Sequence, residues 1–170
     1  MPSSVERRTV DLTAYPDLVV IYLGMRVRAL AGVKALLRIG PQIAKAGAGR
    51  PEGLLHYENN IILSLFPLHL GMRWYWRDLE SMERWARSEP HRVWWQNFLR
   101  DSGGTGFWHE TYFMRGGMEA IYDDVNAPLG LQAFAPSVPA RGPLFSARTR
   151  LRARGDAPAP PVGVAESDLY

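Results

Sequence analysis

Cysteine is absent from this chain of 170 residues, which excludes disulfides, thiolate metal sites and cysteine nucleophiles. Long apolar runs are also absent, since the stretch from Leu18 to Leu23 is far too short to span a bilayer. No apolar segment of a secretory signal follows the charged residues between Met1 and Val10. We therefore expect a cytoplasmic protein without a membrane partner.

Lysine is scarce, because only Lys34 and Lys45 are found among the 20 basic residues. The net charge is +3, but the arginines are scattered. One cluster stands near the C-terminus: Arg148, Arg150, Arg152 and Arg154. A nucleic-acid-binding domain concentrates its cations on one face. We therefore expect no nucleic-acid partner.

Several motifs of large enzyme classes are missing as well. The sequence has no G-x-G-x-x-G after a strand, no P-loop and no G-x-S-x-G. The pair His109-Glu110 begins like the metalloprotease motif H-E-x-x-H but lacks the second histidine. The sequence therefore offers no motif for a nucleotide site, a G-x-S-x-G serine hydrolase or an H-E-x-x-H zinc protease.

Hydrophobic residues, counted with alanine, tyrosine and tryptophan, make up 46 % of the chain. This content and the chain length predict one domain with a hydrophobic core. Alternation is clearest in 68–77, where Leu68, Met72 and Trp76 share one face and Arg73 the other. Strands are predicted at 18–27, 53–58, 68–77 and 105–115, and helices at 30–46 and 78–102. The order β-α-β-β-α-β is that of an α+β ferredoxin-like fold. It has a four-stranded antiparallel sheet with helices on one face.

Local signals refine these elements. Pro41 predicts a kink or break of the first helix near Gly40. The pair Asn59-Asn60 favours a turn or bulge. Ser88 is predicted to cap a second helical segment that begins at Pro90.

Aromatic residues on both strand faces predict that two sheets pack face to face in a homodimer, the arrangement of a dimeric α+β barrel. Residues 1–130 would form this barrel domain. Residues 131–170 are rich in proline, alanine and glycine, and we expect an arm that is disordered from about residue 148.

Two stretches, YWRDLESMERWARSEPHRVWWQNF and GFWHETYFMRGGMEAIYDDVNAPLGL, resemble a monooxygenase-like or phenylacetaldoxime-dehydratase-like family of the dimeric α+β barrel superfamily. The resemblance covers roughly residues 18–131. That superfamily also includes antibiotic-biosynthesis and haem-degrading monooxygenases, chlorite dismutases and haem aldoxime dehydratases. The positions that match the family are Trp76, Arg77, His91, Trp95, Trp108, His109, Glu110, Thr111, Tyr112, Glu119, Tyr122, Asn126, Pro128 and Gly130.

His91 is the first candidate for chemistry. It shares a helical stripe with Trp94, Trp95 and Phe98, at spacings of three, four and seven residues. The resemblance implies that a histidine of this helix can bind haem iron, although related proteins place it about one turn later, where Trp95 stands here. The protein therefore either has no cofactor or binds haem b, and His91 would be a metal ligand only if haem is bound. Packing against tryptophan is the alternative role.

His109 and Glu110 are further catalytic candidates. Neighbouring strand residues point to opposite faces, so they cannot form a direct acid–base pair, and an iron site of two histidines and this carboxylate is disfavoured. The predicted strand order puts the fourth strand beside the second, which makes His56, Tyr57 or His91 the expected partner of Glu110. A proton relay and a structural ion pair both fit such a contact.

Six tryptophans predict either core packing or an apolar pocket for an aromatic or terpenoid-like molecule. The residues expected to bind this substrate are Tyr57, Arg73, Trp76, Trp95, Trp108 and Tyr112. The leading hypothesis is a monooxygenase-like enzyme of secondary metabolism that acts on a small hydrophobic molecule. Alternatives are a haem-binding dehydratase or monooxygenase, a cyclase or isomerase, and a non-catalytic binding or structural dimer.

Overall fold

The computed structural model describes residues 6–114, 117–123, 128, 130–145 and 149–150. The chain forms two compact units, of which one comprises residues 17–113 and the other the two ends, residues 1–16 and 114–170. The predicted boundary near residue 130 stays a prediction. The disorder predicted from about residue 148 falls outside the described residues, apart from Thr149 and Arg150.

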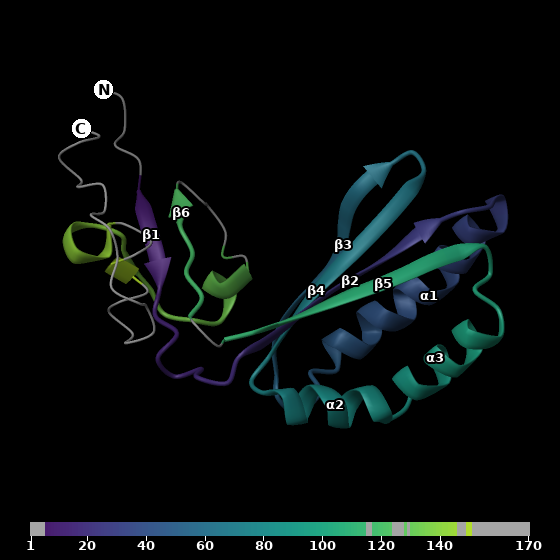
Figure 1. The fold of residues 1–170 in the computed structure, drawn as a ribbon, viewed down its shortest axis with the longest axis horizontal. Helices are drawn as coiled ribbons and strands as arrows, with labels where there is room; N and C mark the ends of the chain where they lie inside the picture. The colour runs from purple at the N-terminus through teal and green to yellow at the C-terminus, as the bar shows by residue number, and fades with distance from the viewer. Residues whose placement is uncertain (1–5, 115–116, 124–127, 129, 146–148, 151–170) are drawn as a thin grey trace. The chain divides into compact units, whose positions relative to one another are not determined.

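The larger unit has the predicted ferredoxin-like α+β fold (Figure 1). Its elements are β2 (Val19–Val27), α1 (Leu30–Ala48), β3 (Leu54–Leu65), β4 (Leu68–Trp76), α2 (Leu79–Arg87), α3 (His91–Arg100) and β5 (Thr105–Phe113). The sheet has the order β3-β4-β2-β5, and all its neighbouring strands are antiparallel. The three helices lie on one face of this sheet.

The strand order corrects one expectation. The fourth predicted strand, β5, pairs with the first, β2, in the register Leu23↔His109, and not with the second, β3. Each helical crossover leaves room for one intervening strand, so β4 lies between β2 and β3, and β2 lies between β4 and β5. The edge strands β3 and β5 are therefore on opposite sides of the sheet.

The core of this unit lies between the sheet and the helices. Val19, Trp74 and Trp76 are fully buried there, and partly buried side chains of α1 and α2, including Ile43 and Trp85, pack against them. The alternation in β4 places both tryptophans on one face, as predicted, and the structure shows that this face is the helix side. Tryptophan packing therefore accounts for part of the aromatic cluster.

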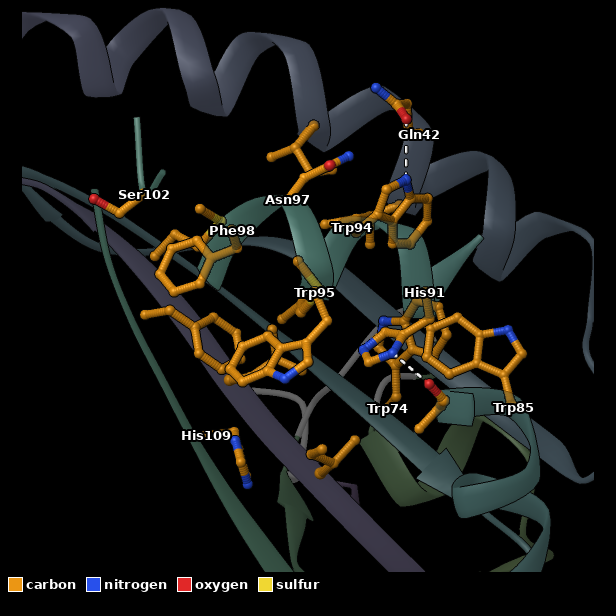
Figure 2. A pocket seen from close by; sticks show the side chains of 18 of the residues that line it. Gln42, Trp74, Trp85, His91, Trp94, Trp95, Asn97, Phe98, Ser102 and His109 are labelled. Carbon is orange, nitrogen blue, oxygen red and sulfur yellow. Dashed lines mark hydrogen bonds between the residues drawn. The ribbon is translucent and has the colours of Figure 1, made fainter. Parts of the chain in front are cut away.

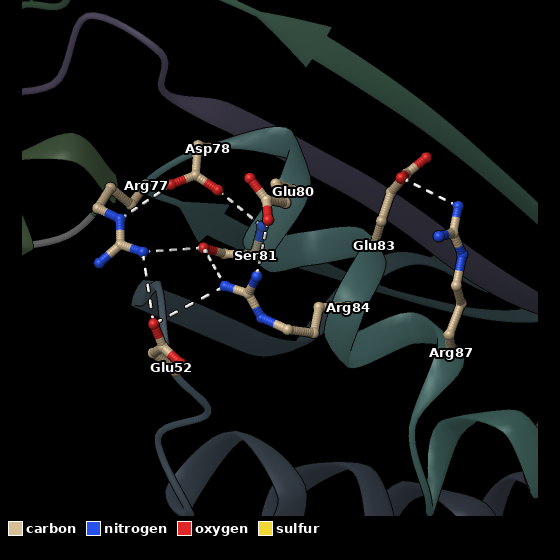
Figure 3. Close-up of polar contacts among 8 residues, drawn as sticks. All are labelled: Glu52, Arg77, Asp78, Glu80, Ser81, Glu83, Arg84 and Arg87. Atoms are coloured by element: carbon tan, nitrogen blue, oxygen red, sulfur yellow. Dashed lines mark hydrogen bonds and ion pairs between the residues drawn. The ribbon is translucent and has the colours of Figure 1, made fainter.

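Helix α2 is fixed at its start by an acidic cap. Asp78 accepts a hydrogen bond of 2.7 Å from the backbone N–H of Ser81, while Arg77 donates to the other carboxylate oxygen at 2.9 Å. Both interactions lower the pKa of Asp78 to about 2. Figure 3 shows this cluster together with Arg84, which reaches Glu80 at 3.1 Å along the helix.

Local predictions had mixed outcomes. Of the kink or break predicted near Gly40, the break is wrong, because α1 is continuous from Leu30 to Ala48 with the exposed Pro41 inside it, and the kink stays a prediction. The bulge is confirmed, since the register of β3 shifts between Glu58 and Ile61. The predicted cap at Ser88 is wrong. Its hydroxyl donates to the Trp85 carbonyl at 2.8 Å, at the end of α2, and so does not cap α3.

The smaller unit contains a sheet that the sequence did not predict. Strand β1 (Arg7–Val10) pairs on one side with β6 (Tyr122–Asp123) and on the other with β7 (Ser137–Pro139). Two short 3₁₀ helices, η1 (Gly130–Ala133) and η2 (Gly142–Leu144), accompany it. Among the described helices of the chain, none is long and apolar enough to cross a membrane.

Candidate functional site

A cavity of about 1000 Å³ lies between the helix side of the sheet and the helices α1, α2 and α3. This volume is at the upper end of the range for small-molecule and cofactor sites. Aromatic rings dominate the lining, and Figure 2 shows several of them, such as Trp85 and Trp95, together with His91 and His109. The aromatic residues of the lining are Trp74, Trp76, Trp85, Trp94, Trp95, Phe98 and Phe107.

His91 begins helix α3 and is held by the end of α2. Its Nδ1 atom lies 2.8 Å from the Ala86 carbonyl oxygen, and because a carbonyl only accepts, Nδ1 carries the proton and donates. The ring also rests against Trp85, with centroids 4.8 Å apart. Burial lowers the pKa of His91, although the hydrogen bond to Ala86 opposes that shift. The neutral imidazole therefore keeps its lone pair on Nε2.

His109 approaches the same cavity from the sheet. It lies on β5, on the helix side, with Phe107 and Thr111. Its ring centroid is 5.9 Å from that of Phe107, and its side chain is exposed. An exposed imidazole in the lining is accessible to a ligand from within the cavity.

Glu110 points to the opposite face of the sheet. It accepts a hydrogen bond from the Tyr112 hydroxyl, and this contact raises the pKa of Tyr112. The expected partners His56 and Tyr57 are wrong, because they lie on β3, at the far edge of the sheet. His91 is wrong as well, since it lies on the helix side. Alternation along β5 separates His109 from Glu110, as the sequence predicted.

The residues expected to bind substrate fall into separate places. Trp76 and Trp95 line the cavity, and Tyr57 packs against the core beside Trp74. Arg73, Trp108 and Tyr112 lie on the other face. There Arg73 pairs with Glu58 at 2.8 Å, and the Trp108 indole N–H donates to His69 at 2.7 Å. The structure therefore brings together His91, His109, Trp76 and Trp95 alone of the nine predicted site residues.

Other residues of the cavity were not singled out from the sequence. Phe107 shares the alternating face of His109, and Trp85 lies within α2 close to the start of α3. The positions of both residues in the sequence could therefore have identified them as neighbours of the two histidines. Arg38 and Arg100 give no comparable signal, because isolated arginines on exposed helices are common. Among the described residues, no group of three His, Asp or Glu side chains could hold a metal ion.

Two curated relatives match this chain in sequence. An aliphatic aldoxime dehydratase of Rhodococcus globerulus is 32% identical over 105 residues, which is 55% of this chain and 27% of that protein. A second, from Rhodococcus erythropolis, is 32% identical over 108 residues, 57% of this chain and 28% of that protein. The chain thus spans about a quarter of the length of these relatives.

Solved structures show the same fold. A crystal structure of aldoxime dehydratase matches with a TM-score of 0.65 and 20% identity, over 88% of this chain and 43% of that one. An aldoxime dehydratase in complex with butyraldoxime matches with a TM-score of 0.64 and 24% identity, over 88% of this chain and 42% of that one. The family model described as Monooxygenase af470-like matches residues 18–131, and the chain belongs to this family.

Proposed function

We propose that this chain is a monooxygenase-like enzyme that binds a small hydrophobic molecule in the aromatic cavity, with His109 as its proton-transferring group. The observation that carries the proposal is the position of His109 and His91 in the lining of one apolar cavity. A site of this kind, with few polar groups in an apolar lining, is typical of small-molecule enzymes.

The cofactor-free reaction requires a base inside the cavity. His109 would accept a proton from the substrate, and the deprotonated substrate would then react with oxygen. Histidine suits this step because it exchanges protons near neutral pH. The surrounding rings of Trp95 and Phe107 would hold the substrate and exclude water.

A haem-binding dehydratase is the second candidate, and the geometry of His91 favours it. The hydrogen bond from Nδ1 to Ala86 fixes the tautomer and leaves Nε2 able to bind iron, which is how protein histidines ligate metals. The cavity volume of about 1000 Å³ and its aromatic lining fit a flat macrocycle. Bound haem would supply an iron centre for Lewis-acid or redox chemistry. The similarity to aldoxime dehydratases supports this version.

In the haem version the chain's own residues would divide the work. His91 would hold the haem, and His109 would move a proton to or from the substrate hydroxyl. The tryptophan-rich lining would keep water away from the reacting groups. The same cavity supports cyclase or isomerase chemistry, and it would serve equally a non-catalytic binding protein.

Haemin reconstitution separates these versions. Purified protein is mixed with haemin, desalted, and scanned for a Soret band; butyraldoxime is then added and butyronitrile measured. The haem version predicts that the unaltered protein retains haemin and that His91→Ala does not. His109→Ala should retain haemin normally but no longer convert butyraldoxime. His69→Ala is the control, because His69 lies on the other face of the sheet. Absence of retention in the unaltered protein removes the haem version.

The cofactor-free version is tested by ligand binding and oxygen uptake. Quenching of the intrinsic tryptophan fluorescence by small aromatic and terpenoid alcohols reports entry into the cavity. Oxygen consumption that depends on ligand and falls in His109→Ala supports the enzyme. Binding without any turnover would leave a non-catalytic binding protein.

The homodimer stays a proposal as well. The unusual number of aromatic side chains on the sheet face opposite the helices, such as Tyr22, Trp108 and Tyr112, supports it. Light scattering coupled to size exclusion measures the mass directly. A monomer at micromolar concentration would contradict the dimeric barrel.

A further inference from the structure

Charged side chains of the cavity are concentrated in few positions. The cations are Arg38, Arg87 and Arg100, and the anions are Glu83 and Asp101. Arg87 pairs with Glu83 at 3.0 Å, and one oxygen of Asp101 accepts a hydrogen bond of 2.8 Å from the Gly103 N–H. The guanidinium groups of Arg38 and Arg100 have no carboxylate within ion-pair distance among the described residues.

The two arginines come from elements that touch each other. The loop after α3 lies against α1: a Cβ built on Gly103 would be 3.1 Å from the Ala35 side chain, and one built on Gly32 would be 2.4 Å from the Gly104 carbonyl oxygen. Arg38 follows Ala35 by three residues and so shares its side of α1. Arg100 precedes Gly103 by three residues. Both therefore lie around the same contact between α1 and the loop.

Polar side chains accompany the arginines. Gln42, Asn97 and Ser102 also line the cavity, and in the view of Figure 2 they lie above the two histidines. The cavity thus has a polar end, where two arginines outnumber the single carboxylate of Asp101. Its remaining surface is apolar, with stacked or edge-on rings of Trp95, Phe98 and Phe107 whose centroids are 5.3–5.8 Å apart.

We propose that Arg38 and Arg100 form an anion-binding end of the cavity, which takes a ligand with an apolar body and a terminal carboxylate. Guanidinium groups bind carboxylates through charge-assisted hydrogen bonds, and because no described protein carboxylate lies within ion-pair distance, the two arginines can bind one on the ligand. The apolar body would lie along Trp95, which is 40% exposed and would gain burial. This inference rests on the proposed function, because it uses the same cavity.

Two sources could supply such a carboxylate: an acidic substrate or the propionates of haem. Two pairs of probes distinguish these sources. Decanoate is compared with the neutral alcohol decanol, and haemin is compared with its dimethyl ester, in which both propionates are blocked. Binding is measured by tryptophan quenching for the first pair and by the Soret band for the second. We expect the acid of at least one pair to bind about 10-fold tighter than its neutral match.

The variants Arg38→Gln, Arg100→Gln and their combination should reduce this preference stepwise, and the double variant should bind acid and neutral probe equally. Both side chains are exposed, so these changes should leave the fold intact, as circular dichroism would verify. Arg84→Gln is the matched control, since Arg84 is an exposed arginine that pairs with Glu80 on α2 and does not line the cavity.

The outcomes separate this inference from the proposed function. Binding of neutral and acidic probes with equal affinity in the unaltered protein overturns the anion site and leaves the cavity as a ligand site. The anion site is also overturned if Arg84→Gln loses as much of the preference for the acidic probe as the double variant does. Binding of no probe would count against both proposals. An acid preference confined to haemin supports the anion site and identifies porphyrin carboxylates as its ligand.

Discussion

His91 at the start of α3 rests on Trp85 of α2, with ring centroids 4.8 Å apart. The same turn between the helices supplies the Ala86 carbonyl that fixes the Nδ1 proton. A short break between two helices therefore both buries the imidazole and sets its tautomer. A ligand histidine needs this combination, because a protonated or rotating ring would not present its Nε2 lone pair.

The first prediction concerns the pH dependence of stability. Burial lowers the pKa of His91 in the folded chain below 6.5, so the unfolded chain binds more protons as the pH falls past that value. Stability should therefore decrease as the pH falls from about 6.5, and His91→Gln should lose less stability than the unaltered protein. Urea midpoints at pH 7.5 and 5.5 measure this difference.

His56 provides the comparison for this experiment. Burial also lowers its pKa as the largest cause, against an opposing effect of Glu58. The double variant His56→Gln/His91→Gln should thus show a weaker pH dependence than either single variant. If His91→Gln lost as much stability between pH 7.5 and 5.5 as the unaltered protein, His91 would not be held neutral by folding.

The sequence predicted the elements with strong local patterns. Alternation identified β4, and helical spacing correctly grouped His91, Trp94, Trp95 and Phe98 on one helix face, which lines the cavity in the structure. The small sheet of the chain ends was missed, because Arg7 and Asp123 pair across more than a hundred residues, and strands this short have no periodicity of their own. Local patterns predict elements, whereas pairing between distant segments depends on the whole fold.

The candidate site was predicted in part for the same reason. Faces follow from alternation, so His109 and Glu110 were correctly assigned to opposite sides. The partner of Glu110 depended on which strand lies beside β5, and that choice was wrong. The residues expected to bind substrate were chosen by chemical type, and they include Trp76 on the helix side and Trp108 on the opposite face, because residue type carries no information about direction.

The second prediction concerns the cap of α2. Removing the Asp78 carboxylate in Asp78→Ala should cost about 1 kcal/mol at pH 7, because the Ser81 N–H loses its acceptor. Asp78→Asn should retain much of the cap. The pKa of Asp78 is about 2 in the folded chain against 3.8 ordinarily. Its ionised form therefore stabilises the fold above about pH 4, and this contribution is lost as the pH falls through 2.

Urea denaturation at pH 7 and pH 3 tests this prediction. The difference between unaltered protein and Asp78→Ala should be smaller at pH 3. Glu83→Ala is the control, since Glu83 forms only a partly exposed pair with Arg87 at 3.0 Å and caps nothing. Equal effects of the two substitutions at pH 7 would contradict a special role for the cap.

The third prediction concerns the face of the sheet opposite the helices. A Cβ on Gly24 would lie 2.8 Å from three atoms of the Trp108 indole, including the nitrogen that donates to His69. Gly24→Ala should therefore displace Trp108 and destabilise the chain by about 1–3 kcal/mol. Gly106→Ala is the matched control, because the nearest atom to its Cβ would belong to the flexible Arg28 side chain, at 3.4 Å, and the Arg26 carbonyl oxygen would be 4.0 Å away. Thermal unfolding of the two variants should differ clearly, and similar midpoints would show that Trp108 moves aside without cost.

The fourth prediction separates the two neighbours on β5. His109 lines the cavity and Glu110 contacts Tyr112 on the other face, so only His109 should affect turnover. His109→Ala should lower the rate about 100-fold or more, the usual contribution of a general acid or base, with ligand affinity nearly unchanged. His109→Gln preserves most of the side-chain volume and should be equally inactive if proton transfer is the function.

Glu110→Gln should leave turnover unchanged and act instead on Tyr112. The Glu110 hydrogen bond and charge raise the pKa of that phenol, so the substitution should shift the ultraviolet titration of one tyrosine to lower pH. This readout shows that the substitution has taken effect even where activity does not change. A fall in turnover as large as that of His109→Ala would mean that the face opposite the helices takes part in the reaction, and the helix-side cavity would then not be the complete site.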